Sequence, residues 1–364
     1  MKNLFVLFCL SFLLISCKKE NKIESEDIGT STAHSEWGDF DLNGTVKSTL
    51  EYTTEEKRDA ENTGSVRKYE NQFKPDIALK FNREGKLINK ISYNENGNVA
   101  EDIIYDGKDR MISKKNFTTP TEYVEAKYTW ENDRNIIITR RFNGSEILDK
   151  EVFLYENGRQ VEKLKYDGHE ILVGRTGFSY DSSNRVSEEI YFRNKSVMQS
   201  RLSIEYDDNG NKALETYYDK NFKVISKTNS TYNNFNQLLN SQTFIANGSL
   251  DSEIFNTYDE KKRLISKGSY DVYDNFKNKE EFEYDQNDNI TVWTLYKDEQ
   301  LISKTVYQYD FKNHLVNHIV TDENGNEIYK KLIEYTYDDN GNWITRKTTL
   351  NNLVLYTSRK IEYY

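Results

Sequence analysis

The segment YDDNGNKALETYYDKNFKVISKTNSTYNNFNQL, residues 206–238, holds one full period of a pattern that fills most of this 364-residue chain. It opens with an aromatic ring, Tyr206, followed by an acid, several turn-forming residues and the start of a new strand-like run. The motif returns at Tyr232, and a weaker copy begins halfway along, at Tyr218. Aromatic and β-branched residues favour strands, and Asn-Gly favours tight turns. The segment therefore predicts two strands and two turns in each period.

The same motif recurs along the chain at spacings of 24 to 28 residues, as the sequence signature of a repeat architecture does. The rings that open the copies, here called the primary rings, are Phe81, Tyr105, Trp130, Tyr155, Tyr180, Tyr206, Tyr232, Tyr258, Tyr284, Tyr309 and Tyr337. The secondary rings follow them by 11 or 12 residues and are Tyr93, Phe117, Phe142, Tyr166, Phe192, Tyr218, Phe244, Tyr270 and Tyr296.

The residues after each ring are typical of hairpin turns. Asp or Asn at the first turn position can accept a hydrogen bond from its own backbone two residues on. Asn-Gly is the strongest short hairpin signal, because both residues tolerate positive φ. We expect such turns at Asn96-Gly97, Asn157-Gly158, Asn209-Gly210 and Asn340-Gly341.

Apolar residues also stand two positions before most primary rings, as in Phe153/Tyr155 and Phe282/Tyr284. Residues i and i+2 of a strand share a face, so these pairs predict one aromatic face, with Lys, Glu, Thr and Ser on the other. We interpret the rings as a core whose members cover each other across strands. The alternative is that the ring ladder is a surface for sugars.

These patterns predict an all-β fold, in which tandem β-hairpin repeats form one long, curled antiparallel sheet. The sheet would be an open superhelical spiral or a partly closed barrel. We expect a repeat domain over 39–364, made of capping hairpins at 39–78, repeats at 79–349 and a closing strand at 350–364. The alternating charges of that closing strand would protect a sheet edge.

The composition supports a folded sheet with one face exposed to solvent. Hydrophobic residues make up only 36% of the chain, but 27 Tyr and 18 Phe are too many for a disordered protein. The formal net charge is −10 with no basic stripe, so we expect no nucleic-acid partner. The two cysteines, Cys9 and Cys17, lie in the first 20 residues, which excludes a disulfide or a thiol site in the repeat domain.

The N-terminus predicts the compartment. Residues 1–16 form a short apolar signal peptide, and Leu14-Ile15-Ser16-Cys17 resembles a bacterial lipobox. That resemblance implies cleavage before Cys17 and acylation of Cys17, including palmitate, which would anchor the protein to a membrane. Residues 17–38 would be the lipidated Cys and a flexible tether. Because Lys18 follows the Cys, we expect an outer-membrane protein, facing the periplasm or the surface.

The repeated motif Tyr-Asp-x-x-Gly-Asn/Arg-apolar, as at Tyr337, resembles the YD repeats of Rhs-type and teneurin-like proteins; the copy at Tyr206 ends in Lys212 instead of an apolar residue. The resemblance covers roughly residues 79–349 and implies a spiralling β-sheet. Some members of that family enclose a toxin and some bind carbohydrate. No toxin-like region follows the last repeat, so we do not expect a cargo role.

Candidates for chemistry are few. The histidines are His34, His169, His314 and His318, and the last two would lie roughly 13 Å apart on a strand, too far for one metal ion. The turn Asp322–Asn326 superficially resembles a calcium loop but lacks the full ligand pattern. We therefore expect no catalytic residues, no metal site and no cofactor, and the sequence singles out no ligand-binding residue.

The sequence thus predicts a cell-envelope lipoprotein that is not an enzyme. We expect a binding or scaffold module for a glycan or an envelope protein, because a repeated surface offers one shallow subsite many times. The alternatives are an Rhs-related protective or immunity partner of a secreted toxin and, third, a glycan-acting enzyme.

Overall fold

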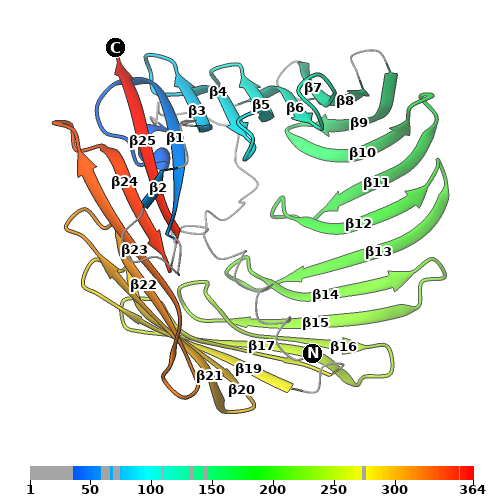
Figure 1. The fold of residues 1–364 in the computed structure, drawn as a ribbon. Helices are drawn as coiled ribbons and strands as arrows, with labels where there is room; N and C mark the ends of the chain where they lie inside the picture. The colour runs from blue at the N-terminus through cyan, green and yellow to red at the C-terminus, as the bar shows by residue number, and fades with distance from the viewer. Residues whose placement is uncertain are drawn as a thin grey trace.

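A computed structural model of the chain describes residues 36–58, 66–68, 74–108, 110–131, 135–142, 146–272, 276–351 and 353–364. They form a short 3-10 helix and 25 strands of one antiparallel sheet, which curls around in a single layer (Figure 1). The all-β repeat fold is thereby confirmed. The bounds are η1 (Glu36–Phe40), β1 (Val46–Arg58), β2 (Val66–Lys68), β3 (Lys74–Phe81), β4 (Leu87–Tyr93), β5 (Val99–Tyr105), β6 (Met111–Phe117), β7 (Tyr123–Glu131), β8 (Asn135–Phe142), β9 (Glu146–Glu156), β10 (Arg159–Asp167), β11 (Leu172–Tyr180), β12 (Val186–Arg193), β13 (Val197–Tyr206), β14 (Lys212–Asp219), β15 (Val224–Tyr232), β16 (Leu238–Ile245), β17 (Leu250–Tyr258), β18 (Leu264–Asp271), β19 (Phe276–Tyr284), β20 (Ile290–Lys297), β21 (Gln300–Tyr309), β22 (Leu315–Asp322), β23 (Glu327–Tyr337), β24 (Trp343–Leu350) and β25 (Leu353–Tyr363).

The predicted signal peptide, Cys17 and most of the predicted tether lie outside the described residues. The last tether residues, 36–38, instead begin η1 and contact the sheet. The backbone N–H of Glu36 donates to the carbonyl of Gly85 at 2.9 Å, and the Trp37 indole N–H donates to the carbonyl of Val46 at 2.8 Å. The folded part therefore starts slightly earlier than the predicted boundary.

The sheet returns to its own beginning. From β3 onward each strand pairs with the next, as far as β25. β1 pairs with β3 on one side and with β25 on the other, in a register that runs from Val46↔Tyr363 to Lys57↔Leu353. We call this junction of β1, β3 and β25 the seam; Figure 1 shows the three strands side by side.

The pairing at the seam corrects the prediction for residues 350–364. β25 lies between β24 and β1, so it is not an edge strand. Its charges meet charges of β1 instead: the Arg359 guanidinium lies 2.7 Å from the Glu51 carboxylate, and the Lys47 ammonium lies 3.6 Å from that of Glu362. The prediction was wrong because the sequence of β25 does not reveal a partner about 300 residues away.

Local turn chemistry explains why strands end where they do. After Tyr180, the Asp181 carboxylate accepts the backbone N–H groups of Ser183 and Arg185, both at 2.9 Å. Asn184 takes φ 67° and closes the turn, a type I turn followed by a left-handed residue. The same first-position bonding recurs at Asn82, Asn94, Asp106, Asp167, Asp207, Asp219, Asn233, Asp285, Asp310, Asp322 and Asp338. The Asp/Asn prediction is confirmed.

Turns form at all four Asn-Gly pairs as predicted, but the expected positive φ of both residues needs a correction. Both residues have positive φ only at Asn157 (52°) and Gly158 (79°), a two-residue turn between β9 and β10. At 96–97, 209–210 and 340–341 only the glycine is left-handed. In those turns Asp or Asn two or three positions earlier sets a longer turn, which requires one left-handed residue rather than two.

The primary and secondary rings lie on opposite faces of the sheet. Tyr218 pairs across strands with Arg201, and Arg201 is five residues from Tyr206 on the same strand. Cross-strand partners share a face, and residues an odd number apart on a regular strand do not. The register shifts between Glu205 and Tyr206, and a similar shift follows most primary turns. The aromatic side chains are therefore divided between a primary face and a secondary face.

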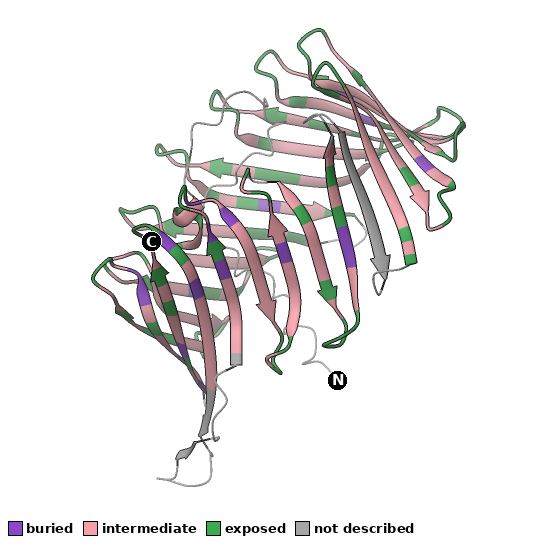
Figure 2. Cartoon of the chain, turned by 90° about the horizontal axis from the view of Figure 1, so that it is seen from above, coloured by how far each residue is buried: buried purple, intermediate pink, exposed green. Residues whose placement is uncertain are grey.

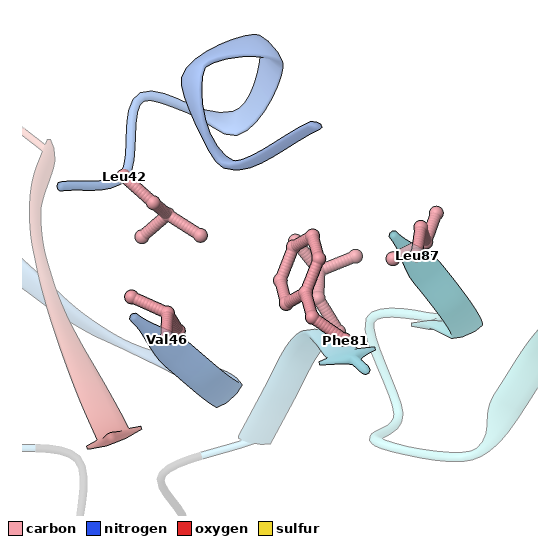
Figure 3. Packing of buried hydrophobic residues seen from close by; sticks show 5 residues of the cluster. Leu42, Val46, Phe81 and Leu87 are labelled. Atoms are coloured by element: carbon pink, nitrogen blue, oxygen red, sulfur yellow. The ribbon is translucent and has the colours of Figure 1, made fainter. Parts of the chain in front are cut away.

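Neither set of rings forms the predicted core. Most residues are partly exposed on both faces of the single layer, and buried positions are scattered along it (Figure 2). Among the primary rings only Phe81, at 1% exposed, is buried. The contiguous core is a small cluster at the seam, where η1 covers β1, β3 and the start of β4 (Figure 3); its buried members are Leu42, Val46, Leu79, Phe81 and Leu87.

Candidate functional site

Most primary rings, which form the ring ladder, hydrogen-bond to the backbone of the neighbouring strand. The hydroxyl of Tyr206 donates to the backbone carbonyl of Val186 on the neighbouring strand, at 2.7 Å. Trp130 makes the equivalent bond from its indole N–H to the carbonyl of Met111, at 2.9 Å. The same bond runs from Tyr180 to Gln160, Tyr232 to Lys212, Tyr258 to Leu238, Tyr284 to Leu264 and Tyr309 to Ile290. Each of these seven primary rings thus links its strand to the previous repeat and stays partly exposed.

The primary turns are also linked to one another. The Arg263 guanidinium bonds Asp259 of its own turn at 2.7 Å, reaches Asp288 of the next turn at 2.8 Å, and lies 4.7 Å from the centre of the Tyr284 ring. Asn211 reaches Asn236 in the same way, at 3.1 Å. The turn carboxylates are therefore occupied, and hydrogen bonds from the backbone N–H and guanidinium of Arg185 hold the pKa of Asp181 below its usual value.

The turn at Asp322 shows the same use of its oxygens. The Asp322 carboxylate accepts the backbone N–H groups of Asn324 and Asn326 and the Asn326 side-chain amide, at 2.8 to 3.0 Å. Over the described ranges, no group of three or more His, Cys, Asp or Glu residues is gathered closely enough to hold a metal ion.

The histidines lie in separate surroundings. His169 is exposed in a turn, and His34 lies outside the described residues. His314 contacts the Tyr337 hydroxyl at 2.6 Å and the Asp41 carboxylate at 2.5 Å, where the N-terminal loop meets the last repeats. His318 lies between the rings of Tyr307 and Tyr329, each centroid 4.9 Å away. His314 and His318 therefore contact different residues in the structure.

Cationic and aromatic side chains gather at a place where the turn and ring pattern does not require them. It lies on the primary face near the seam, on the adjacent strands β23, β24 and β25. Its cations are Lys331, Arg346 and Arg359, and its rings are Tyr335 and Trp343. We call these five residues the cationic patch.

Packing within the cationic patch is dense. Trp343 is 5% exposed, and the guanidinium carbons of Arg359 and Arg346 lie 3.6 Å and 5.1 Å from the centre of its indole ring. Tyr335 pairs with Arg346 across the strands and contacts Trp343 edge-on, with centroids 6.3 Å apart. Cation–π contacts of this kind hold both guanidinium groups in place.

Charge in the cationic patch is only partly compensated. Arg359 forms an ion pair with Glu51, and both side chains are nearly buried, at 9% and 13% exposed. No described carboxylate forms an ion pair with Lys331 or Arg346. The buried Nη1 of Arg359 and Nε of Arg346 have no hydrogen-bond acceptor. A buried donor without an acceptor costs free energy, so these two groups are held at a cost by the packing around Trp343.

The titration behaviour agrees with uncompensated positive charge. Burial lowers the pKa of Lys331, and the nearby Arg346 lowers it further. Burial also lowers the pKa of His318 to about 4, with a second contribution from Lys331, its cross-strand partner. Burial lowers the pKa of Arg359, against the opposing effect of Glu51.

Sequence reasoning did not find the cationic patch, although the repeat carries a signal for it. Six positions before the primary ring, successive repeats hold the small polar residues Ser200, Ser226, Ser252, Asn278 and Ser303. The last repeat has Lys331 at this position. A repeat aligned on its rings therefore marks Lys331 as a departure that neither turn nor ring chemistry explains.

No protein-family model matches the sequence, and no curated protein matches it. Among solved structures, the chain is similar to a Photorhabdus luminescens Tc holotoxin pore, with 13% identity and a TM-score of 0.40 over 79% of this chain and 20% of that one. A TcdB2–TccC3 complex gives 12% identity and a TM-score of 0.28, over 85% and 25%. A porin-like protein from Bacteroides uniformis gives 10% identity and a TM-score of 0.26, over 66% and 96%. The chain spans about a quarter or less of those toxin chains, and these values assign neither a family nor a function.

Proposed function

We propose that this chain is a lipid-anchored protein of the bacterial cell envelope whose repeat domain is a non-catalytic binding or scaffold module for glycans. The observation that carries the proposal is a long, repetitive, single-layered sheet on which the described repeat rings other than Phe81 stay partly exposed. Planar rings with a polar tip suit sugar faces, and a repeated subsite suits an extended ligand.

The polar groups of the repeats support a binding rather than a catalytic role. Carboxylates of the turns are bonded to their own backbone, as at Asp181, and the phenols of the ring ladder are bonded to carbonyls, as at Tyr206. General acid–base catalysis needs a titratable group with its pKa near the working pH and within reach of a substrate. Hydrogen bonds from the backbone and from neighbouring side chains lower the pKa of Asp181 and Asp207, and burial raises the pKa of Tyr180 and Tyr206.

Membrane attachment in this proposal rests on Cys17. No helix among the described residues is long and apolar enough to cross a membrane. Expression in a Gram-negative host with labelled palmitate tests the anchor: we expect label in the full chain and none in Cys17→Ser. Equal labelling of both chains would contradict the anchor.

Binding is tested on a soluble chain that begins at residue 17 and carries Cys17→Ser. The chain is applied to arrays of neutral and acidic polysaccharides, with heat-unfolded protein as the control. We expect binding to at least one polysaccharide that unfolding abolishes. An array with no folded-state binding would remove the glycan role.

A further inference from the structure

We propose that the primary face of β23, β24 and β25 binds an anionic polysaccharide, one that carries carboxylate or sulfate groups, through Lys331 and Arg346. This inference rests on the proposed glycan binding and specifies its ligand class. It concerns residues that neither the repeat pattern nor the strand pairing requires.

The first argument is charge. The chain as a whole has a formal net charge of −10, and most of its cations are paired or dispersed. In the cationic patch three cations share one face of three adjacent strands, and Glu51 is the carboxylate that pairs with one of them. An excess of positive charge on one face, against the overall field, attracts an anion to that place.

The second argument is the unmet hydrogen-bonding capacity. The side chain of Arg346 has one weak bond, from Nη2 to the Thr357 hydroxyl at 3.4 Å, and its Nε has no acceptor. Lys331 and Arg346 are both partly exposed, so a ligand can reach them. Guanidinium groups bind carboxylates and sulfates through charge-assisted hydrogen bonds, and the partly exposed Arg346 side chain, with its single weak bond, has donors left for one.

The third argument is the spacing of the cations. Lys331 of β23 pairs with Leu350 of β24, and Tyr335 of β23 pairs with Arg346 of β24. The two cations are therefore four positions apart along the strand direction. Four residues of a strand span about 13 Å. The two cations thus start from separate backbone positions along the sheet, which successive charged groups of an extended polymer can match. The geometry therefore favours a polyanion.

The fourth argument concerns the source of the charge. Lys331 and Arg346 each lie in the middle of their own strand, although Lys331 pairs with Leu350, the last residue of β24. A flat bilayer that touches a rim does not reach the middle of a strand. The lines of side chains on the primary face instead offer a path for a flexible chain, which separates an acidic polysaccharide from an anionic lipid surface.

Arg359 has a positioning role in this site. It holds the indole of Trp343 from one side while Arg346 lies near the same ring, and its other contact is Glu51 across the seam. Replacement of Arg359 would disturb the seam as well as the cationic patch. The test therefore uses Lys331 and Arg346.

The experiment compares the soluble chain with Lys331→Gln/Arg346→Gln and with Lys267→Gln. Lys267 is a matched control, because it occupies the same place after Tyr258 as Arg346 does after Tyr337, lies on the same face and is exposed. Titration calorimetry measures binding to polygalacturonate, dextran sulfate, neutral dextran and phosphatidylglycerol vesicles. Circular dichroism and thermal melting establish that each variant is folded.

We expect one or both polyanions to bind the soluble chain and Lys267→Gln equally, and Lys331→Gln/Arg346→Gln at least about 10-fold more weakly. Equal weakening in Lys267→Gln, no weakening in the double variant, or patch-dependent binding of vesicles would overturn the inference. Binding of neutral dextran alone would overturn it while leaving glycan binding intact. Absence of binding to any polysaccharide would contradict both this inference and the proposed glycan-binding function.

Discussion

The middle of the array and the seam are built from the same turns and rings, yet their primary faces differ. In the middle, small hydroxyls meet across β15 and β16: Ser230 donates to Ser241 at 3.0 Å, and Thr228 lies 3.0 Å from Thr243. The seam instead holds a nearly buried ion pair, a buried indole and an apolar cluster. The ring and turn chemistry specifies the repeat, whereas the seam residues hold the two ends together.

This difference predicts how stability is distributed. In a repeat array each unit contacts mainly its neighbours, so a change in the middle removes a small nearest-neighbour contribution. A change at the seam removes packing that joins the first strand to the last. Substitutions of similar chemistry should therefore cost more at the seam than in the middle.

The largest effect is expected at Phe81, which is 1% exposed and packs against Phe40 with ring centroids 5.6 Å apart. Phe81→Ala should lower the free energy of unfolding by about 3–5 kcal/mol, because it leaves a cavity in the seam cluster. Phe235→Ala, a change at a ring 59% exposed in a middle turn, should cost less than about 1 kcal/mol. Urea unfolding followed by tryptophan fluorescence measures both changes. Equal losses of the free energy of unfolding in the two variants would contradict a difference in stability between the seam and the middle of the array.

The next largest effect is expected at the nearly buried ion pair between Arg359 and Glu51. Glu51→Ala should cost about 3 kcal/mol, since it leaves the Arg359 guanidinium buried without its partner. The control is Glu362→Ala on the same junction, because Glu362 and its partner Lys47 have side chains 67% and 55% exposed. Exposed ion pairs contribute little to stability, so Glu362→Ala should have nearly the same free energy of unfolding as the wild type. A larger loss for Glu362→Ala than for Glu51→Ala would show that the seam is not where β1 and β25 are held.

A pH dependence is expected from His318. Its pKa is about 4 in the folded chain and near 6.5 when unfolded. Between these values the unfolded state binds a proton that the folded state does not, so the free energy of unfolding should fall as pH drops below 6.5. After discounting for partial exposure, His318 should contribute about 2 kcal/mol to this fall. Unfolding of the wild type and His318→Gln at pH 7.5 and 4.5 measures it; identical pH profiles would contradict the prediction.

The smallest effect is expected for the ring ladder in the middle of the array. Tyr206→Phe removes the hydrogen bond to the carbonyl of Val186 and should cost about 1 kcal/mol. Tyr217→Phe is the control, because that ring is 45% exposed and lies in the neighbouring strand; it should leave the unfolding midpoint unchanged. A cost for Tyr206→Phe as large as that for Phe81→Ala would contradict the comparison of the two regions.

Local chemistry made the repeat predictable from the sequence. A ring, an Asp and a left-handed residue determine a turn within a few positions, so Asp181 and its counterparts could be recognised without any distant partner. The division of the rings between two faces could not be predicted from the sequence, because it depends on one-residue shifts of the strand register, such as the shift between Glu205 and Tyr206. The pairing of β1 with β25 depends on residues far apart in the chain, and the cationic patch depends in turn on that pairing.

The meeting of the first and last strands is tested most directly by a cross-link. Thr53 and Thr357 are cross-strand partners on β1 and β25, with hydroxyl oxygens 2.9 Å apart, so cysteines at both positions lie within reach of a disulfide. In a Cys17→Ser background that begins at residue 17, the chain has no other cysteine. We predict that Thr53→Cys/Thr357→Cys forms an intramolecular disulfide on mild oxidation, seen as one linked peptide pair by mass spectrometry. Free thiols in the folded, oxidised protein would contradict the curled sheet that returns to its own beginning.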